Sequence, residues 1–301
     1  MITLLLVAAL SLPVQVQGDG FVVRAELGMD SLAQRVAGEV PGALAAIYED
    51  LPDMRRREVI EIRLVKESAS LQGAAPGGAG VPEWAAGVAF PRAGIIAVAA
   101  RRGANPIDVS STVTHELAHM ALGAALDGRA PRWLDEGFAY LHSSDYSWAR
   151  TRTLTGLAWS GDRYFFFELE DRFPPGENQA GRAYAQAYDF VSYLAKRGRY
   201  ADDKDDGDRE PFRRFLHELA IGRTLDGAAL ESYGVSFKTL EDEWWTRVRE
   251  RYLWSLVGMF TLFVWVVGAI LLTIGYWRKR RLSRRKLAEW DEEDAIREAT
   301  L

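Results

Sequence analysis

Two histidines four residues apart are the feature of this sequence best suited to chemistry. His115 and His119 enclose Glu116 in the run HELAH at residues 115–119. On a helix, side chains at positions i and i+4 lie one above the other, so both imidazoles can reach a single zinc ion. Glu116 is rotated to the same side, where it can hold and deprotonate a zinc-bound water that the metal has already acidified.

The pentapeptide alone is weak evidence, because composition produces it by chance on the order of once in a hundred chains of this length. Here the run takes two of only four histidines in the chain. A catalytic zinc site needs a third protein ligand and one open position. The segment PRWLDEGFAY at residues 131–140 places carboxylates one short loop later. We therefore expect Glu136 to be the third ligand, and Asp135 to orient a ligand or cap the helix.

A β-α-β opening is expected to precede the motif. Hydrophobic alternation predicts strands at residues 21–26 and 59–65, and helical spacing predicts a helix at 31–51 between them. Residues 87–100 are typical of one or two short strands interrupted at 91–94.

The motif helix should follow these strands. Asp108 or Ser110 could cap its start, and we expect it to end near Leu122, before Gly123. The second half of the chain is expected to be mostly helical, with further helices at residues 134–142, 180–196, 212–221 and 240–252.

The beginning of the chain is typical of a targeting segment. Residues 2–12 are apolar but too few to span a bilayer, and a small-residue site follows, with Val16 at the third position before a cut after Gly18. We expect residues 1–18 to be a signal peptide. An uncleaved anchor or a buried strand are the alternatives, because the start carries no Lys or Arg.

The end of the chain is typical of a membrane anchor. Residues 253–277 contain no charged side chain, and about 20 apolar residues suffice to cross the hydrocarbon layer. Basic residues are more numerous after this span, at 278–286, than before it. The sequence therefore predicts a single-pass protein of the inner membrane, with residues 19–252 outside the cytoplasm and a tail at 278–301 inside it.

Composition excludes several classes of protein. The chain has no cysteine, which excludes disulfides, thiolate zinc ligands and a cysteine nucleophile. Its net charge is only -5, and its basic residues do not gather on a folded stretch, so we expect no nucleic-acid partner. A hydrophobic content of 48% over 301 residues can supply a sizeable core.

These segments resemble the gluzincin zinc metallopeptidases, in particular the peptidase MA-like family related to the thermolysin and aminopeptidase clan. The resemblance covers residues 85 to 250 and is carried by HELAH, by WLDEGFA at 133–139 and by YAQAY at 184–188. It implies that two histidines and a glutamate bind one zinc ion, that the glutamate of HELAH is the general base, and that a tyrosine on a later helix stabilises the oxyanion. Carried over to this chain, the metal ligands are His115, His119 and Glu136, and the catalytic residues are Glu116 and Tyr184.

The resemblance also implies an α+β, thermolysin-like fold, in which a small mixed sheet precedes the motif helix and a helical half follows. Tyr188 is the runner-up for the oxyanion role, because it lies one helical turn after Tyr184. Asp135 stands where the related aminopeptidases commonly have asparagine, and residues 87–100 lack their glycine-rich signature, so aminopeptidase specificity is not implied.

The sequence therefore predicts a membrane-anchored zinc peptidase that hydrolyses peptides or proteins. Two alternatives stay open. One is a membrane-tethered binding or scaffold protein that keeps the fold without turnover. The other is a zinc hydrolase that acts on a non-peptide bond.

Overall fold

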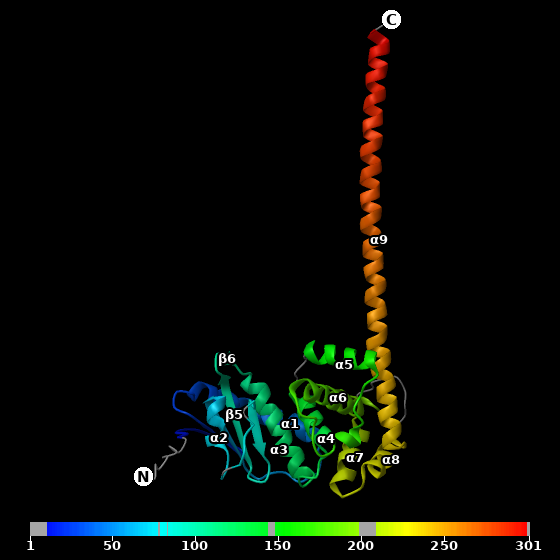
Figure 1. Cartoon of the computed structure of the whole chain (residues 1–301). Helices are drawn as coiled ribbons and strands as arrows, with labels where there is room; N and C mark the ends of the chain where they lie inside the picture. The colour runs from blue at the N-terminus through cyan, green and yellow to red at the C-terminus, as the bar shows by residue number, and fades with distance from the viewer. Residues whose placement is uncertain (1–10, 78, 83, 144–147, 199–208, 300–301) are drawn as a thin grey trace, which may run out of the picture. The chain divides into compact units, whose positions relative to one another are not determined.

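The computed structural model describes residues 11–77, 79–82, 84–143, 148–198 and 209–299 (Figure 1). Its contacts divide the chain into two compact units, Met1–Arg247 and Val248–Leu301. The first unit contains the sheet, the helices that cover it and a helical half.

A mixed sheet forms from the first third of the chain. Its strands are β1 (Val14–Gly18), β2 (Phe21–Ala25), β3 (Ile60–Glu67), β4 (Gly87–Phe90), β5 (Ile95–Arg102) and the short β6 (Asn105–Pro106). They lie in the order β1-β2-β3-β5-β4, with β6 paired to β5. The three central strands are parallel, while β1 and β4 pair antiparallel at the two ends of this path. This arrangement leaves β4 as the last strand at its end of the path.

Alternate residues of the central strands pack on opposite faces of the sheet, as strand geometry requires. On one face, Ala97 and Ala99 of β5 pack with Leu71 and Ala74 of the short helix α2 (Leu71–Ala74), which follows a 3-10 turn at Ser68–Ser70. The other face is covered by α1 (Asp30–Glu49), which packs on β1 and β2, and by α3 (Val109–Ala125), which packs on β4 and β5 (Figure 1). Because both faces are covered, β5 is buried from Ile96 to Ala99.

The helical half follows α3. It contains α4 (Arg132–His142), α5 (Trp148–Ser160), α6 (Glu177–Lys196), α7 (Glu210–Ala220), α8 (Leu225–Tyr233) and the beginning of α9 (Phe237–Ala299). An aromatic cluster joins α4, α6 and the start of α9, in which the ring of Phe190 lies within 6 Å of those of Trp133, Phe166, Phe237 and Trp244.

Gly137 is the residue that lets α4 and α6 approach closely. A β-carbon at this position would lie 2.5 Å from both the carbonyl oxygen of Ala187 and a methyl group of Val191. The glycine that follows Glu136 in the second sequence segment therefore has a packing role, and it fixes the distance between two helices that line the site described below.

The predicted end of the motif helix was wrong. We expected Gly123 to end it, whereas α3 continues to Ala125. Gly123 is needed for another reason, since a β-carbon there would lie 3.0 Å from the ring of Pro91 in the β4–β5 turn. The chain instead leaves the helix at Asp127 and Gly128, both of which have positive φ angles.

Strand β1 falls within the predicted signal peptide. Its five residues pair in register with β2, from Val14 opposite Ala25 to Gly18 opposite Phe21. A cut after Gly18 would remove this strand, and the sheet would then begin at β2. Residues 1–10, which hold most of the apolar stretch, lie outside the described residues.

The second unit consists, in its described residues, of the continuation of α9. Thr261–Leu287 is long and apolar enough to cross a membrane, with a mean hydropathy of 1.5, and it overlaps the span predicted at 253–277.

Candidate metal centre

Helix α3 presents both motif histidines from its middle. Its start is fixed by Asp108, whose side chain accepts a hydrogen bond from the Ser111 backbone N–H at 3.1 Å, as an N-cap residue does. One helical turn apart, His115 and His119 bring their Nε2 atoms to within 3.2 Å of each other. Both side chains are largely buried, with 16% and 13% of their surface exposed.

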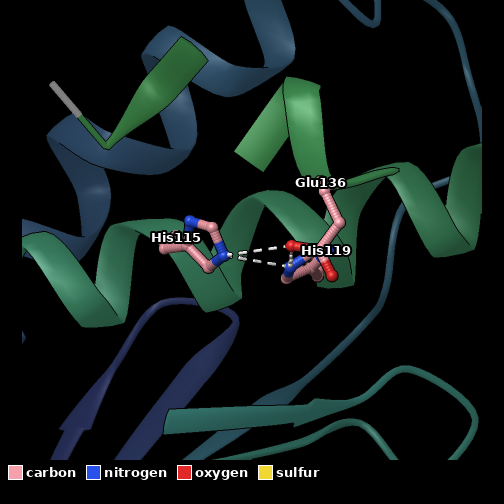
Figure 2. A group of neighbouring side chains, drawn as sticks. All are labelled: His115, His119 and Glu136. Carbon is pink, nitrogen blue, oxygen red and sulfur yellow. Dashed lines mark hydrogen bonds and ion pairs between the residues drawn. The ribbon is translucent and has the colours of Figure 1, made fainter. Parts of the chain in front are cut away.

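Helix α4 brings Glu136 to the same point. Its Oε2 atom lies 3.8 Å from Nε2 of His115 and 3.7 Å from Nε2 of His119. Figure 2 shows the two imidazoles on α3 and the carboxylate of Glu136 converging on one another. The ligand atoms of these residues all lie within 4.8 Å of one another, so the group could hold a metal ion.

The spacing of these atoms fits a zinc ion. A tetrahedral ion with ligand bonds of about 2.0–2.2 Å holds its ligand atoms about 3.3–3.6 Å apart. The two imidazole nitrogens, at 3.2 Å, lie close to the lower end of this spacing. The carboxylate oxygen, at 3.7 and 3.8 Å, needs to move by only a few tenths of an ångström to fall within it.

Negative charge surrounds His119. Its Nδ1 atom lies 2.9 Å from Oδ1 of Asp135, so this carboxylate can orient the ring and leave Nε2 to face the cluster. Burial lowers the pKa of His119, but Asp135, Glu136 and Glu116 outweigh burial and raise this pKa to about 10. A site that attracts a proton so strongly is also suited to a dication, and the position of Asp135 agrees with the orienting role expected for it.

Glu116 lies beside the cluster, buried to 6% exposure. Burial raises the pKa of its carboxyl group, while His119 and His115 lower it. The β4 backbone is in close contact, since a β-carbon on Gly87 would lie 3.0 Å from Oε1 of Glu116 and 2.7 Å from Thr112. A glycine is therefore required at the point where the strand passes the expected base.

Tyr184 lies on α6, where it lines the same hollow as the cluster. Burial raises the pKa of its phenol, and so does Glu136, while Arg132 lowers it. The net shift is upward, so the hydroxyl stays protonated at neutral pH and can donate a hydrogen bond. Tyr188 is not among the described residues that line the hollow; its ring packs under the guanidinium of Arg150, 4.0 Å from the ring centroid.

The hollow beside the cluster has a volume of about 250 Å³. Its lining contains all five residues predicted to bind metal or do chemistry, together with Asp135 and with Gly87, Val88 and Ala89 of the predicted strand segment 87–100. The remaining lining residues, to which the sequence assigned no role, are Pro82, Trp84, Ala85, Arg132 and Tyr140. A larger hollow of about 690 Å³, which several arginines line near the end of α3, contains none of the predicted site residues.

Arg132 and Tyr140 are the two polar side chains that sequence reasoning missed. Nη2 of Arg132 lies 2.5 Å from Oε1 of Glu136, and the ring of Tyr140 lies 4.6 Å from that of His115, edge to face. Both stand four residues from Glu136 on α4, one on each side. The i±4 rule that pairs the histidines would therefore have placed them on the face of α4 that carries Glu136.

Comparison with known proteins agrees with this geometry. No curated protein matches the sequence. A sequence model of the peptidase MA superfamily matches residues 42–250, a range that includes α3, α4 and α6. Members of this superfamily are typically metal-dependent, and the cluster of two histidines and a glutamate is of the kind that can hold a metal ion. The chain belongs to the peptidase MA superfamily.

Proposed function

We propose that this protein is a membrane-anchored, zinc-dependent peptidase. The observation that carries the proposal is the convergence of His115, His119 and Glu136 beside a hollow that Glu116 and Tyr184 also line. Three ligand atoms on one side of an open space are what a catalytic zinc site needs, because its fourth position must receive water or substrate.

In this proposal Glu116 is the general base. A zinc ion held by His115, His119 and Glu136 would acidify the attacking water and polarise the scissile carbonyl. Glu116 takes a proton from the attacking water and passes it to the leaving amine. Its position supports this role, because its buried carboxyl group lines the hollow together with the three proposed ligands.

Tyr184 is the proposed oxyanion donor. Its protonated hydroxyl can donate a hydrogen bond to the oxygen on which charge develops as the carbonyl is attacked. Tyr184 comes from α6, and it lines the same hollow as β4.

Strand β4 is the proposed site for the main chain of the substrate. It is the last strand on its side of the sheet, and its residues Gly87, Val88 and Ala89 line the hollow. The Ala99 backbone N–H donates to the carbonyl of Ala86 on the β5 side. In an antiparallel pair, the backbone N–H and C=O groups of successive residues point alternately toward the partner strand and away from it. Because Ala86 bonds to β5, the N–H and C=O of Ala89, three residues later, point to the open edge, where an extended peptide can pair.

The anchor is the apolar part of α9, with the tail in the cytoplasm and the catalytic domain outside. This orientation is supported by the basic residues that follow the span. An epitope inserted in the exposed turn at Gly103 should be removed by protease added outside the inner membrane, whereas one placed after Leu301 should be protected. Protection of the Gly103 epitope would contradict the orientation.

A direct test of the activity uses the full chain, purified in detergent and loaded with zinc, with a peptide library as substrate. We expect peptide bonds to be cleaved, and a chelator to abolish cleavage until zinc is restored. Zinc binding without cleavage of any peptide or protein would favour the scaffold alternative. Chelator-sensitive hydrolysis of esters or other bonds alone would favour a non-peptide hydrolase.

A further inference from the structure

Arg132 contacts the two groups on the helical side of the site whose orientation matters most. Its guanidinium lies 2.5 Å from Oε1 of Glu136, lines the same hollow as Tyr184, and lowers the pKa of the Tyr184 phenol. We propose that Arg132 is a positioning residue that fixes which oxygen of Glu136 faces the metal and directs the hydroxyl proton of Tyr184 into the cleft. This inference rests on the proposed function.

The first effect concerns the two oxygens of Glu136. Oε2 faces both imidazoles, at 3.7 and 3.8 Å, while Oε1 is held by Arg132 on the side away from them. A carboxylate whose second oxygen is engaged in this way presents a single oxygen to the ion. The guanidinium therefore keeps Glu136 a one-oxygen ligand and leaves room for water and substrate.

The second effect concerns the hydroxyl of Tyr184. A guanidinium has five N–H donors and no acceptor, whereas a phenol can both accept and donate. When Arg132 donates to Tyr184, the phenol oxygen must therefore be the acceptor. Its own proton is then free to point elsewhere, and the open direction is the hollow that Tyr184 lines.

The surroundings of Arg132 hold it in place for these effects. Its backbone N–H donates to the carbonyl of Glu170 at 2.6 Å. The ring of Phe173 lies 5.9 Å from the guanidinium carbon and packs edge to face on the ring of Tyr184, with centroids 4.8 Å apart. One aromatic side chain thus supports both members of the pair.

Zinc affinity is a poor measure of this role. The positive guanidinium repels a dication, so removing Arg132 relieves repulsion and loosens a ligand at the same time, and the two effects oppose each other. The better measures are the coordination of the metal and the rate of the chemical step.

The first experiment replaces zinc by cobalt in the full chain and records the visible absorption spectrum of Arg132→Leu. A four-coordinate cobalt site absorbs visible light more strongly than a five-coordinate one, so the spectrum reports how many atoms bind the ion. We expect lower absorption per bound cobalt in Arg132→Leu, because the freed Glu136 binds through both oxygens. Arg182→Leu is the matched control. Arg182 lies on α6 and pairs with Asp162, so its loss removes an ion pair of an arginine outside the lining of the hollow, and the variant should keep the wild-type spectrum.

The second experiment uses Arg132→Lys to separate the two effects. A lysine can still pair with Glu136 four residues later on the helix, but its single ammonium group cannot also hold Tyr184 as the guanidinium fork does. Arg132→Lys should therefore keep the cobalt spectrum. With zinc bound, it should lower kcat about tenfold with little change in KM.

The same substitution in the Tyr184→Phe background should then change kcat by less than about twofold, because no hydroxyl is left to direct. Equal losses in both backgrounds, or an unchanged cobalt spectrum in Arg132→Leu, would overturn the inference. The cobalt arm needs no peptidase activity, so it also tests Arg132 if peptide hydrolysis is not found. A wild-type chain that binds neither zinc nor cobalt would instead contradict the proposed function itself.

Discussion

The two walls of the hollow beside the metal cluster differ in chemistry. Among the residues that the structure describes, the wall from β4 and the loop before it presents apolar side chains and glycine, such as Trp84, Gly87 and Ala89. The wall from α4 and α6 carries the ionisable side chains, including Glu136, Tyr184 and Arg132. Helix α3, with Glu116, lies between them.

This difference assigns different tasks to the two walls. Backbone groups on an open strand edge hold a peptide in the same way before and during reaction, so they contribute uniform binding and act on KM. The side chains of the helical wall meet charge that develops only in the transition state, so they act on kcat. Substitutions on the two walls should therefore have kinetically distinct effects.

On the helical wall, Tyr184→Phe should have the largest effect. Removing one oxyanion donor typically costs about a hundredfold to a thousandfold in turnover, so kcat should fall by about this factor while zinc content and KM stay nearly unchanged. Steady-state kinetics with a cleaved peptide measure both constants.

Tyr188→Phe is the matched control, because Tyr188 lies on the same helix but outside the lining of the hollow. It should change kcat little. Small and equal losses in both variants, or a large loss only in Tyr188→Phe, would remove Tyr184 from the mechanism.

On the sheet wall, Ala89→Pro should have a smaller effect of the other kind. Proline removes the Ala89 N–H, which points to the open edge, and keeps the hydrogen bonds between β4 and β5 intact. Edge strands tolerate proline at such a position. The loss of one hydrogen bond, about 0.5–1.5 kcal/mol, should raise KM by between about twofold and about tenfold, with kcat nearly unchanged. A fall in kcat at constant KM would show that β4 does not hold the substrate as proposed. Ala89→Val, which keeps the N–H, is the control.

The contact between α4 and α6 can be loosened without touching the lining. Gly137→Ala forces a methyl group against the Ala187 carbonyl, and overpacking of this kind typically costs about 1–3 kcal/mol of the free energy of unfolding. The change should appear as a lower midpoint in chemical denaturation, with a smaller loss of kcat than Tyr184→Phe causes. A variant as stable as the wild type would show that the two helices are not held as closely as the structure has them.

The sequence predicted the parts of the fold and site that depend on local geometry. Helical spacing placed His115 and His119 on one face of α3, and the loop length placed Glu136 within reach, because each relation spans few residues. The structure brings these residues together, while their roles stay predictions. The strands β2, β3, β4 and β5 and the helices α1, α4, α6 and α7 also agree with the predicted ranges.

The rest depended on tertiary packing. Gly123 is an apparent helix end by residue type, yet it lies inside α3, at a point where a β-carbon would meet the ring of Pro91. Strand β1 is a half-exposed edge strand within a segment typical of a signal peptide, and α5 and α8 were not predicted. Arg132 was missed for a different reason, since nothing in its residue type distinguishes a positioning arginine from a surface one.

Metal content and turnover, measured together in Glu116→Gln and Glu136→Ala, test the central claim most directly. We expect Glu116→Gln to keep one zinc ion per chain while losing a hundredfold to ten-thousandfold in kcat, about the contribution of a general base. Glu136→Ala should lose zinc, because it removes a ligand. Wild-type activity in Glu116→Gln, or wild-type zinc affinity in Glu136→Ala, would contradict the assignment of base and ligand.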